Sequence, residues 1–142
     1  MRYIAKKYNP SLLGSSAAEL GRIEMLSAHV DKLKGEATGP CYGSGDASAI
    51  IESCRPLIKK LNDVKGSNKW LAGENLSWLD FYFAETLDLL DKISAGVFYQ
   101  EFPALKEYFD AFINLPGMAE YWQTCMKIPF NNKMAKLQGN CE

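Results

Sequence analysis

Residues 70–91, WLAGENLSWLDFYFAETLDLLD, predict a capped helix at the centre of the fold. Ser77 and Asp80 form the pattern Ser-x-x-Asp, in which the serine hydroxyl accepts a hydrogen bond from a free backbone N–H at the helix start. The acidic side chain three residues on accepts one from the N–H of the capping residue, so we assign Ser77 and Asp80 as a structural cap. Apolar side chains then recur at steps of three and four at Leu79, Phe83, Leu87 and Leu90. Because the first turns are apolar on nearly all sides, we expect this helix to lie inside the core.

The composition describes a single globular domain with no preference for nucleic acid or membranes. A chain of 142 residues can bury a sound core. Its net charge of −1 does not favour a polyanionic partner. No apolar run approaches the ~20 residues of a membrane span.

Cysteine and histidine usage argues against a metal site and predicts a cytoplasmic protein. Four cysteines are scattered without C-x-x-C spacing, and His29 is the single histidine. This pattern is typical neither of a zinc site nor of a thioredoxin-type redox pair. Scattered thiols in a chain that begins without the apolar segment of a secretory signal fit a reducing cytosol.

Two more helices are predicted before the central one. Ser16 begins a second capping pattern, and the apolar spacing from Ile23 to Leu33 predicts a helix that ends near Lys34, with Gly35 as its stop. The glycine-rich residues 36–45 are predicted to form a loop. Asp46 is expected to cap the next helix, whose apolar stripe runs to Val64, and Pro56 is expected to bend or split that helix.

The rest of the chain completes an all-α prediction. Pro103 stands at the tolerated first position of a helix, and another helix follows the turn at residues 114–117. No segment alternates with a period of two, so we expect almost no strand. The predicted fold is an all-α bundle of about five helices.

The first eight residues look like the end of a longer helix. Ile4 and Tyr8 are four residues apart, and Asn9-Pro10 stops the pattern. A helix this short is marginal alone in water, so the simplest interpretation is that its start is missing. The alternative is a frayed N-terminal tail.

Several of these motifs resemble the helical C-terminal domain of glutathione transferases, and of the mu class in particular. The matching segments are Trp70-x-Ala72-Gly73, Ser77-x-x-Asp80-Phe81, Phe102-Pro103-x-Leu105-Lys106, Leu115, Tyr121 and Lys133-Met134-Ala135. The opening MRYIAKKY resembles the end of the thioredoxin-fold domain that precedes the helical domain in this class. The resemblance therefore implies that residues 1–12 are the end of such a domain plus linker, and residues 13–142 the helical domain.

The resemblance also implies a function. The chain would be the electrophile-binding half of a mu-like transferase that conjugates the glutathione thiolate to small hydrophobic electrophiles. Glutathione would be a co-substrate, no cofactor would be bound covalently, and the protein would form a homodimer. Because the glutathione-activating domain would precede Met1, the chain alone is expected to be inactive.

Four site residues follow from the resemblance. Cys41-Tyr42 aligns with a Cys-Tyr pair whose tyrosine hydroxyl faces the electrophile, so Tyr42 is implied as a catalytic and substrate-binding residue. Asn131 and Asn132 stand where the class offers an aromatic residue and a serine to the substrate. Asp31 is the candidate for an aspartate that reaches the glutathione of the partner subunit. A gapless alignment puts Lys32 at that position, and one residue is about 100° around a helix.

Two other functions remain open at this point. The chain can be a non-catalytic helical module for ligand binding or protein interaction, in which Tyr42 only packs in a turn. A weaker hypothesis gives Cys41 or Cys125 a redox role, which requires a low thiol pKa.

Overall fold

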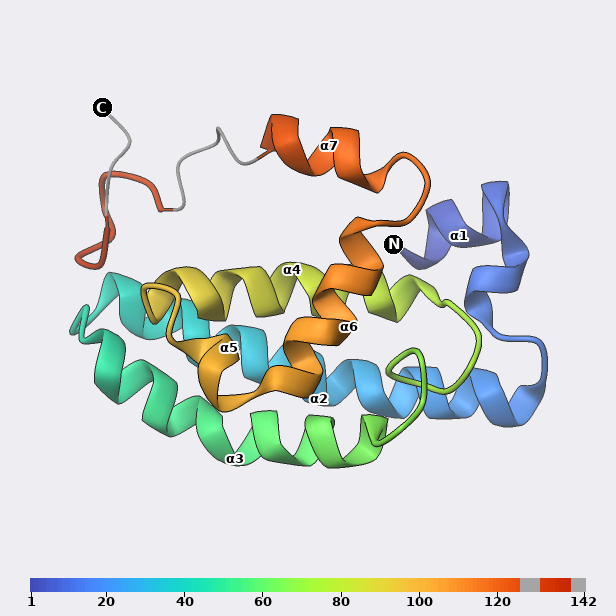
Figure 1. The fold of residues 1–142 in the computed structure, drawn as a ribbon, viewed down its shortest axis with the longest axis horizontal. Coiled ribbons are helices and arrows are strands. Elements are labelled where there is room, and N and C mark those ends of the chain that lie inside the picture. The colour runs from blue at the N-terminus through green and yellow to red at the C-terminus, as the bar shows by residue number, and fades with distance from the viewer. Residues whose placement is uncertain (126–130, 139–142) are drawn as a thin grey trace.

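A computed structural model of the chain describes residues 1–125 and 131–138, and its regular elements are helices (Figure 1). The elements are α1 (Arg2–Tyr8), the 3₁₀-helix η1 (Pro10–Leu13), α2 (Ala17–Tyr42), α3 (Ala47–Lys65), α4 (Trp78–Ile93), α5 (Phe98–Glu101), α6 (Pro103–Ile113) and α7 (Met118–Cys125). The described ranges contain no strand, and an isolated bridge joins Trp70 and Gly73. The predicted all-α fold is therefore confirmed, and none of these helices has the length and apolarity needed to cross a membrane.

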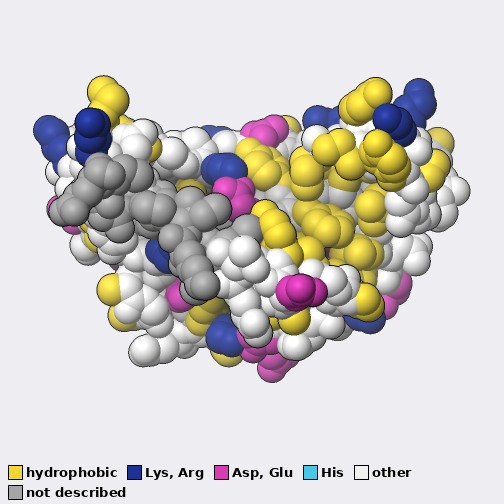
Figure 2. Space-filling model, turned by 90° about the horizontal axis from the view of Figure 1, so that it is seen from above, with side chains coloured by type: hydrophobic (Ala, Val, Ile, Leu, Met, Phe, Trp, Pro, Cys, Tyr) yellow, Lys and Arg dark blue, Asp and Glu magenta, His cyan; other side chains and the backbone are white. Residues whose placement is uncertain are grey.

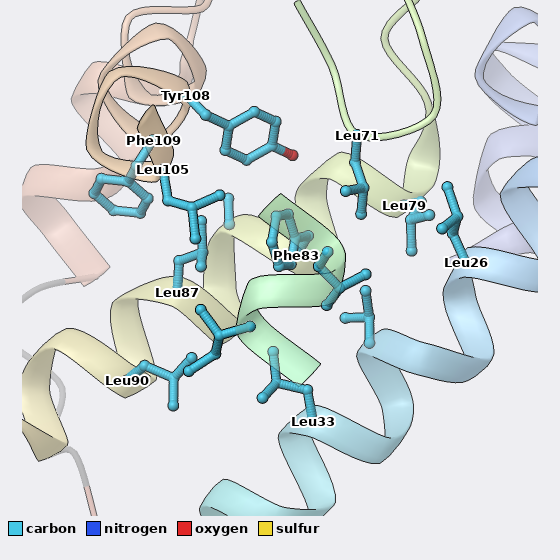
Figure 3. Packing of buried hydrophobic residues seen from close by; sticks show 14 of the residues in the cluster. Leu26, Leu33, Leu71, Leu79, Phe83, Leu87, Leu90, Leu105, Tyr108 and Phe109 are labelled. Atoms are coloured by element: carbon cyan, nitrogen blue, oxygen red, sulfur yellow. The ribbon is translucent and has the colours of Figure 1, made fainter. Parts of the chain in front are cut away.

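Helix α4 lies in the middle of the bundle, as its capping box and apolar spacing predict. It contacts the four helices α2, α3, α5 and α6. Leu79, Phe83, Leu87 and Leu90 are fully buried. Figure 3 shows these side chains between Leu26 and Leu33 of α2 and the side chains of α6. Burial of each large apolar side chain is worth roughly 1.5–3 kcal/mol, so this helix organises the core.

Helices α1 and α7 lie on one side of the bundle, and hydrophobic side chains gather on the face that carries them (Figures 1 and 2). Arg2 pairs with Glu24 at 2.6 Å, and the buried Ala5 faces the bundle. Tyr3, Ile4 and Tyr8 are exposed. Helix α1 therefore attaches to α2 by one side and leaves its apolar side uncovered in this chain.

The prediction that α2 ends at Gly35 is wrong. The helix continues through Gly39 and Pro40 to Tyr42, so most of the predicted loop at residues 36–45 is helical. Burial explains the difference, because Ala37 and Cys41 extend the apolar stripe of Leu33 at steps of four and have no exposed surface. Tertiary packing overrides the low helix propensity of glycine and proline here.

Helix α3 begins as predicted, with the side chain of Asp46 accepting a hydrogen bond of 3.1 Å from the N–H of Ala49. It passes Pro56 without interruption, so of the two expected effects of Pro56 the split does not occur, and the bend stays a prediction. Cys54 and Ile58 on either side of the proline are both buried against the rest of the core. This packing holds the helix together where one backbone hydrogen bond is missing.

Candidate functional site

Tyr42 is the last residue of α2, and its side chain is 41% exposed. Its neighbour Cys41 is completely buried. The chain turns sharply after it, because the N–H groups of Gly43 and Gly45 both donate to the carbonyl oxygen of Pro40 at 3.0 Å. Tyr42 thus combines an accessible phenol with a fixed backbone, which is the arrangement a hydrogen-bond donor to a ligand requires.

Residues 131–138, which we call the strap, lie against this end of α2. The N–H groups of Lys136 and Leu137 donate to the carbonyl oxygen of Cys41 at 2.9 and 3.1 Å. The side chain of Gln138 reaches the carbonyl oxygen of Lys92 near the end of α4. The fold therefore brings Asn131 and Asn132, which are about ninety residues away in sequence, to the end of α2.

The two asparagines of the strap have different surroundings. Asn131 is buried and donates to the carbonyl oxygen of Leu137 at 2.8 Å, while the Cys41 thiol donates to the carbonyl oxygen of Ala37. Asn132 is exposed, and its side-chain oxygen accepts a hydrogen bond of 2.9 Å from the N–H of Met134. Both amides thus take part in the strap itself, and their contact with a substrate stays a prediction.

One face of α2 leads from Tyr42 toward Asp31. Asp31, Gly35, Thr38 and Tyr42 follow the spacing i, i+4, i+7, i+11, which puts them along one side of the helix. Apart from the backbone of α2 itself, no atom lies within 4 Å of the position that a Cβ on Gly35 would occupy. The hydroxyl of Thr38 is buried and finds no hydrogen-bond partner among the described residues. Gly35 thus leaves the surface of this face open, whereas the Thr38 hydroxyl is sealed from solvent.

Sequence reasoning missed Gly35 and Thr38 because it assigned residues 36–45 to a loop. Had the helix been extended to Tyr42, helical spacing alone would have placed both residues on the tyrosine's face.

Asp31 lies near the side of α4 that carries Tyr82. Burial raises the pKa of Tyr82 to about 12, and a hydrogen bond to Asp31 adds to the rise. Lys34 pairs with Glu85 of α4, and its Nζ lies 4.8 Å from the centroid of the Tyr82 ring. Asp31 is therefore directed toward α4. Its contact with a partner subunit stays a prediction.

Lys32, the other residue considered for the cross-subunit position, lies on the outside of the bundle. It is largely exposed and pairs with Glu36 on its own helix at 3.7 Å. Asp31 and Lys32 thus have different surroundings although they are adjacent in sequence.

An apolar groove lies between α4, α6 and α7 and has a volume of about 440 Å³. Phe81 and Tyr82 of α4, Phe112 of α6, and Tyr121 and Trp122 of α7 line it. Its opening lies on the face of hydrophobic side chains seen in Figure 2. An aromatic groove of this size suits an apolar ligand or a packed partner. Tyr42 does not line it.

The raised pKa values of the buried thiols argue against the redox hypothesis. Burial raises the pKa of Cys54 to about 11, and burial also raises the pKa of Cys41. A redox role requires a lowered pKa, so the hypothesis is wrong for Cys41. The side chain of Cys125 lies outside the described residues. Within the described ranges, no group of three histidine, cysteine or acidic side chains could hold a metal ion.

Comparison with known proteins found a protein family that matches this chain. A family model described as the C-terminal domain of glutathione S-transferase matches residues 47–124, more than half of the chain. The chain belongs to this glutathione S-transferase family. The match covers α3 to α7 and the capping box of α4, and Tyr42 lies just before it.

Curated transferases of the mu class match almost the whole chain. Glutathione S-transferase Mu 5 of Rattus norvegicus is 30% identical over 141 residues, covering 96% of this chain and 61% of the relative. Mu 3 of Homo sapiens is 32% identical over 143 residues, again covering 96% and 61%. A class-mu 26 kDa isozyme of Fasciola hepatica is 30% identical over 130 residues. The mu-like resemblance is confirmed, and the chain spans about three fifths of the length of these transferases.

Proposed function

We propose that this chain is the electrophile-binding, helical part of a mu-like glutathione transferase. The reaction is the conjugation of the glutathione thiolate to small hydrophobic electrophiles. The observation that carries the proposal is the family match over α3 to α7, next to a half-exposed tyrosine at the end of α2. Glutathione is the co-substrate, and no covalently bound cofactor takes part. The protein acts as a homodimer in the cytoplasm.

Tyr42 is the proposed catalytic residue of this chain. As the thiolate sulfur bonds to the electrophilic carbon, electron density moves onto the electrophile's acceptor group. The Tyr42 hydroxyl donates a hydrogen bond to that group and stabilises the growing negative charge. Its exposure supports this role, since a hydroxyl sealed in the core could not reach a ligand.

The remaining proposed residues surround Tyr42. Asn131 and Asn132 are proposed to make the substrate side of the strap polar. Asp31 is proposed to approach the glutathione of the partner subunit, and its exposure on α2 supports this role.

The proposed domain division assigns residues 1–12 to the end of a thioredoxin-fold domain with its linker, and residues 13–142 to the helical domain. The uncovered apolar side of α1 and the aromatic groove support it, because exposed apolar surface of this kind commonly marks a contact. The thioredoxin-fold domain would cover this surface and supply the site that activates glutathione, so the chain alone is expected to be inactive.

The alternative of a non-catalytic helical module uses the same fold for ligand or protein binding. Membership in the transferase family favours the proposed function over it. The two differ in one measurable property, because only a transferase domain completes a conjugating enzyme when it is joined to a glutathione-binding domain.

A chimera tests the proposal. The thioredoxin-fold domain of a class mu relative is fused in front of Met1, glutathione binding is checked by isothermal titration, and conjugation of 1-chloro-2,4-dinitrobenzene is measured. We expect conjugation, and we expect Tyr42→Phe to lower kcat/KM on the order of tenfold to a hundredfold. Lys59→Ala, at an exposed residue of α3, is the control. A chimera that binds glutathione without conjugating would support the non-catalytic module.

A further inference from the structure

The last turn of α2, which ends in Tyr42, is intrinsically weak. Gly39 has the low helix propensity of glycine, and Pro40 has no N–H to donate to the carbonyl group of Glu36 four residues earlier. Local sequence preference therefore favours a loop in this segment, although the structure contains a helix. A contact from outside the helix must contribute to the difference.

The strap supplies this contact through backbone hydrogen bonds. Carbonyl groups in the last turn of a helix have no partner within the helix. The carbonyl oxygen of Cys41 accepts the N–H groups of Lys136 and Leu137, and that of Pro40 accepts those of Gly43 and Gly45. The strap thus bonds to the residue immediately before Tyr42.

Asn131 fixes the shape of the strap. Its amide donates to the carbonyl oxygen of Leu137, so it closes residues 131–137 into a compact ring. The side chain of Asn131 is buried, and the ring carries the two N–H groups that bond to Cys41. One asparagine therefore holds the shape in which the strap bonds to Cys41.

Gly45 makes the close approach of the strap possible. A Cβ at this position would lie 2.9 Å from Cβ of Lys136 and 3.1 Å from the backbone nitrogen of Leu137. That nitrogen is one of the two that donate to Cys41, so the strap cannot move aside without losing this hydrogen bond. Gly45 also has φ +68, a left-handed conformation that favours glycine.

We propose that residues 39–45 and the strap open and close as one cooperative unit, and that Gly45 and Asn131 are positioning residues for Tyr42. The strap offsets the local preference of residues 39–42 for a loop and so keeps the tyrosine at the end of a helix. Loosening the strap misplaces the Tyr42 hydroxyl without removing it. The part of this inference that concerns catalysis rests on the proposed function; the cooperative unit does not.

Hydrogen exchange of the native chain tests the cooperative unit. We expect the amides of Gly43, Gly45, Lys136 and Leu137 to exchange with a common protection factor, below that of the amides of α4. Gly45→Ala and Asn131→Ala should each raise exchange of all four at least tenfold and leave α4 unchanged. Gly96→Ala is the matched control, since Gly96 also has positive φ but no atom near the position of a Cβ. Two results would show that residues 39–45 and the strap do not form a cooperative unit. One is independent exchange of the strap and the end of α2, and the other is equal effects of Gly45→Ala and Gly96→Ala.

Kinetics of the chimera test the positioning role separately. Gly45→Ala and Asn131→Ala should lower kcat severalfold with little change in glutathione affinity by titration. In a Tyr42→Phe background the same substitutions should have little further effect, because there is no hydroxyl left to misplace. Equal effects in both backgrounds would show that the strap does not act through Tyr42. A conjugation-inactive chimera would refute the proposed function and the positioning role, while the exchange result would stand by itself.

Discussion

The hydroxyl of Tyr108 donates a hydrogen bond of 2.8 Å to Oδ1 of Asp80, so a side chain of α6 holds the cap of α4. Asp80 has no exposed surface and also accepts hydrogen bonds from the N–H of Leu71 and from the N–H and hydroxyl of Ser77. Burial raises the pKa of Asp80, and the four donated hydrogen bonds oppose this rise. One carboxyl group thus links the loop before α4, the start of α4 and helix α6.

Tyr108→Phe removes one donor from this group and keeps the ring. We expect a loss of about 2 kcal/mol in the free energy of unfolding, the usual range for a hydrogen bond to a charged group. Urea denaturation measures it. Tyr3→Phe, at a tyrosine that is 75% exposed, should change stability by less than ~0.5 kcal/mol. Equal stabilities of Tyr108→Phe and the parent protein would contradict the importance of this hydrogen bond.

Asp80→Ala should be more damaging than Tyr108→Phe. It leaves the N–H groups of Leu71 and Ser77 and the hydroxyl of Tyr108 without their acceptor inside the core. Because several buried donors would be left unsatisfied, we expect the free energy of unfolding to fall by about 3–5 kcal/mol. Urea denaturation again measures this loss. The exposed Asp110, replaced by alanine, is the control. The two core substitutions should also be non-additive, because they remove the same hydrogen bond.

Gly35→Ala tests the unexpected length of α2. Gly35 lies inside the helix without positive φ, and a Cβ there would meet no atom within 4 Å apart from the backbone of α2 itself. Alanine should therefore stabilise the protein by about 0.5–1 kcal/mol, because glycine is the poorer helix former. Gly21→Ala, elsewhere in α2, should behave alike, whereas Gly66→Ala, at φ +51, should destabilise. If the helix stopped at Gly35, alanine at this position would instead lower stability.

The raised pKa of the Cys54 thiol predicts a loss of stability at alkaline pH. Burial raises its pKa from the ordinary value of 9.0 to about 11. Between these values the unfolded chain loses the thiol proton while the folded chain keeps it, so the free energy of unfolding falls as the pH rises. Urea denaturation from pH 8 to pH 11 should show this fall, and Cys54→Ala should reduce its slope. Alkylation of native Cys54 should be slow at pH 8, and rapid alkylation there would contradict the raised pKa.

Capping patterns and apolar spacing in the sequence predicted much of the fold correctly. The Ser77–Asp80 pattern and the apolar spacing of Leu79 to Leu90 identify α4 and its central position, because a cap and a helical stripe act within a few residues of each other. Asp46 and Pro103 mark the starts of α3 and α6 for the same reason. The transferase family could also be recognised at this level, since its motifs consist of these same segments.

The course of α2 beyond Gly35 depended on partners distant in sequence. Glycine and proline at residues 35–40 favour a stop, and the opposing contribution comes from the burial of Cys41 and from the amides of Lys136 and Leu137. The surroundings of Tyr42 were therefore not readable from nearby residues. The same holds for the hydrogen bond between Tyr108 and Asp80.

The sequence by itself thus determined where most helices begin, which of their sides are buried and which family the chain resembles. Only the tertiary structure decided where α2 ends and what holds Tyr42 there. The physical reason is that capping and helical periodicity act over three or four residues, whereas the end of α2 is stabilised by a strap about ninety residues away in sequence.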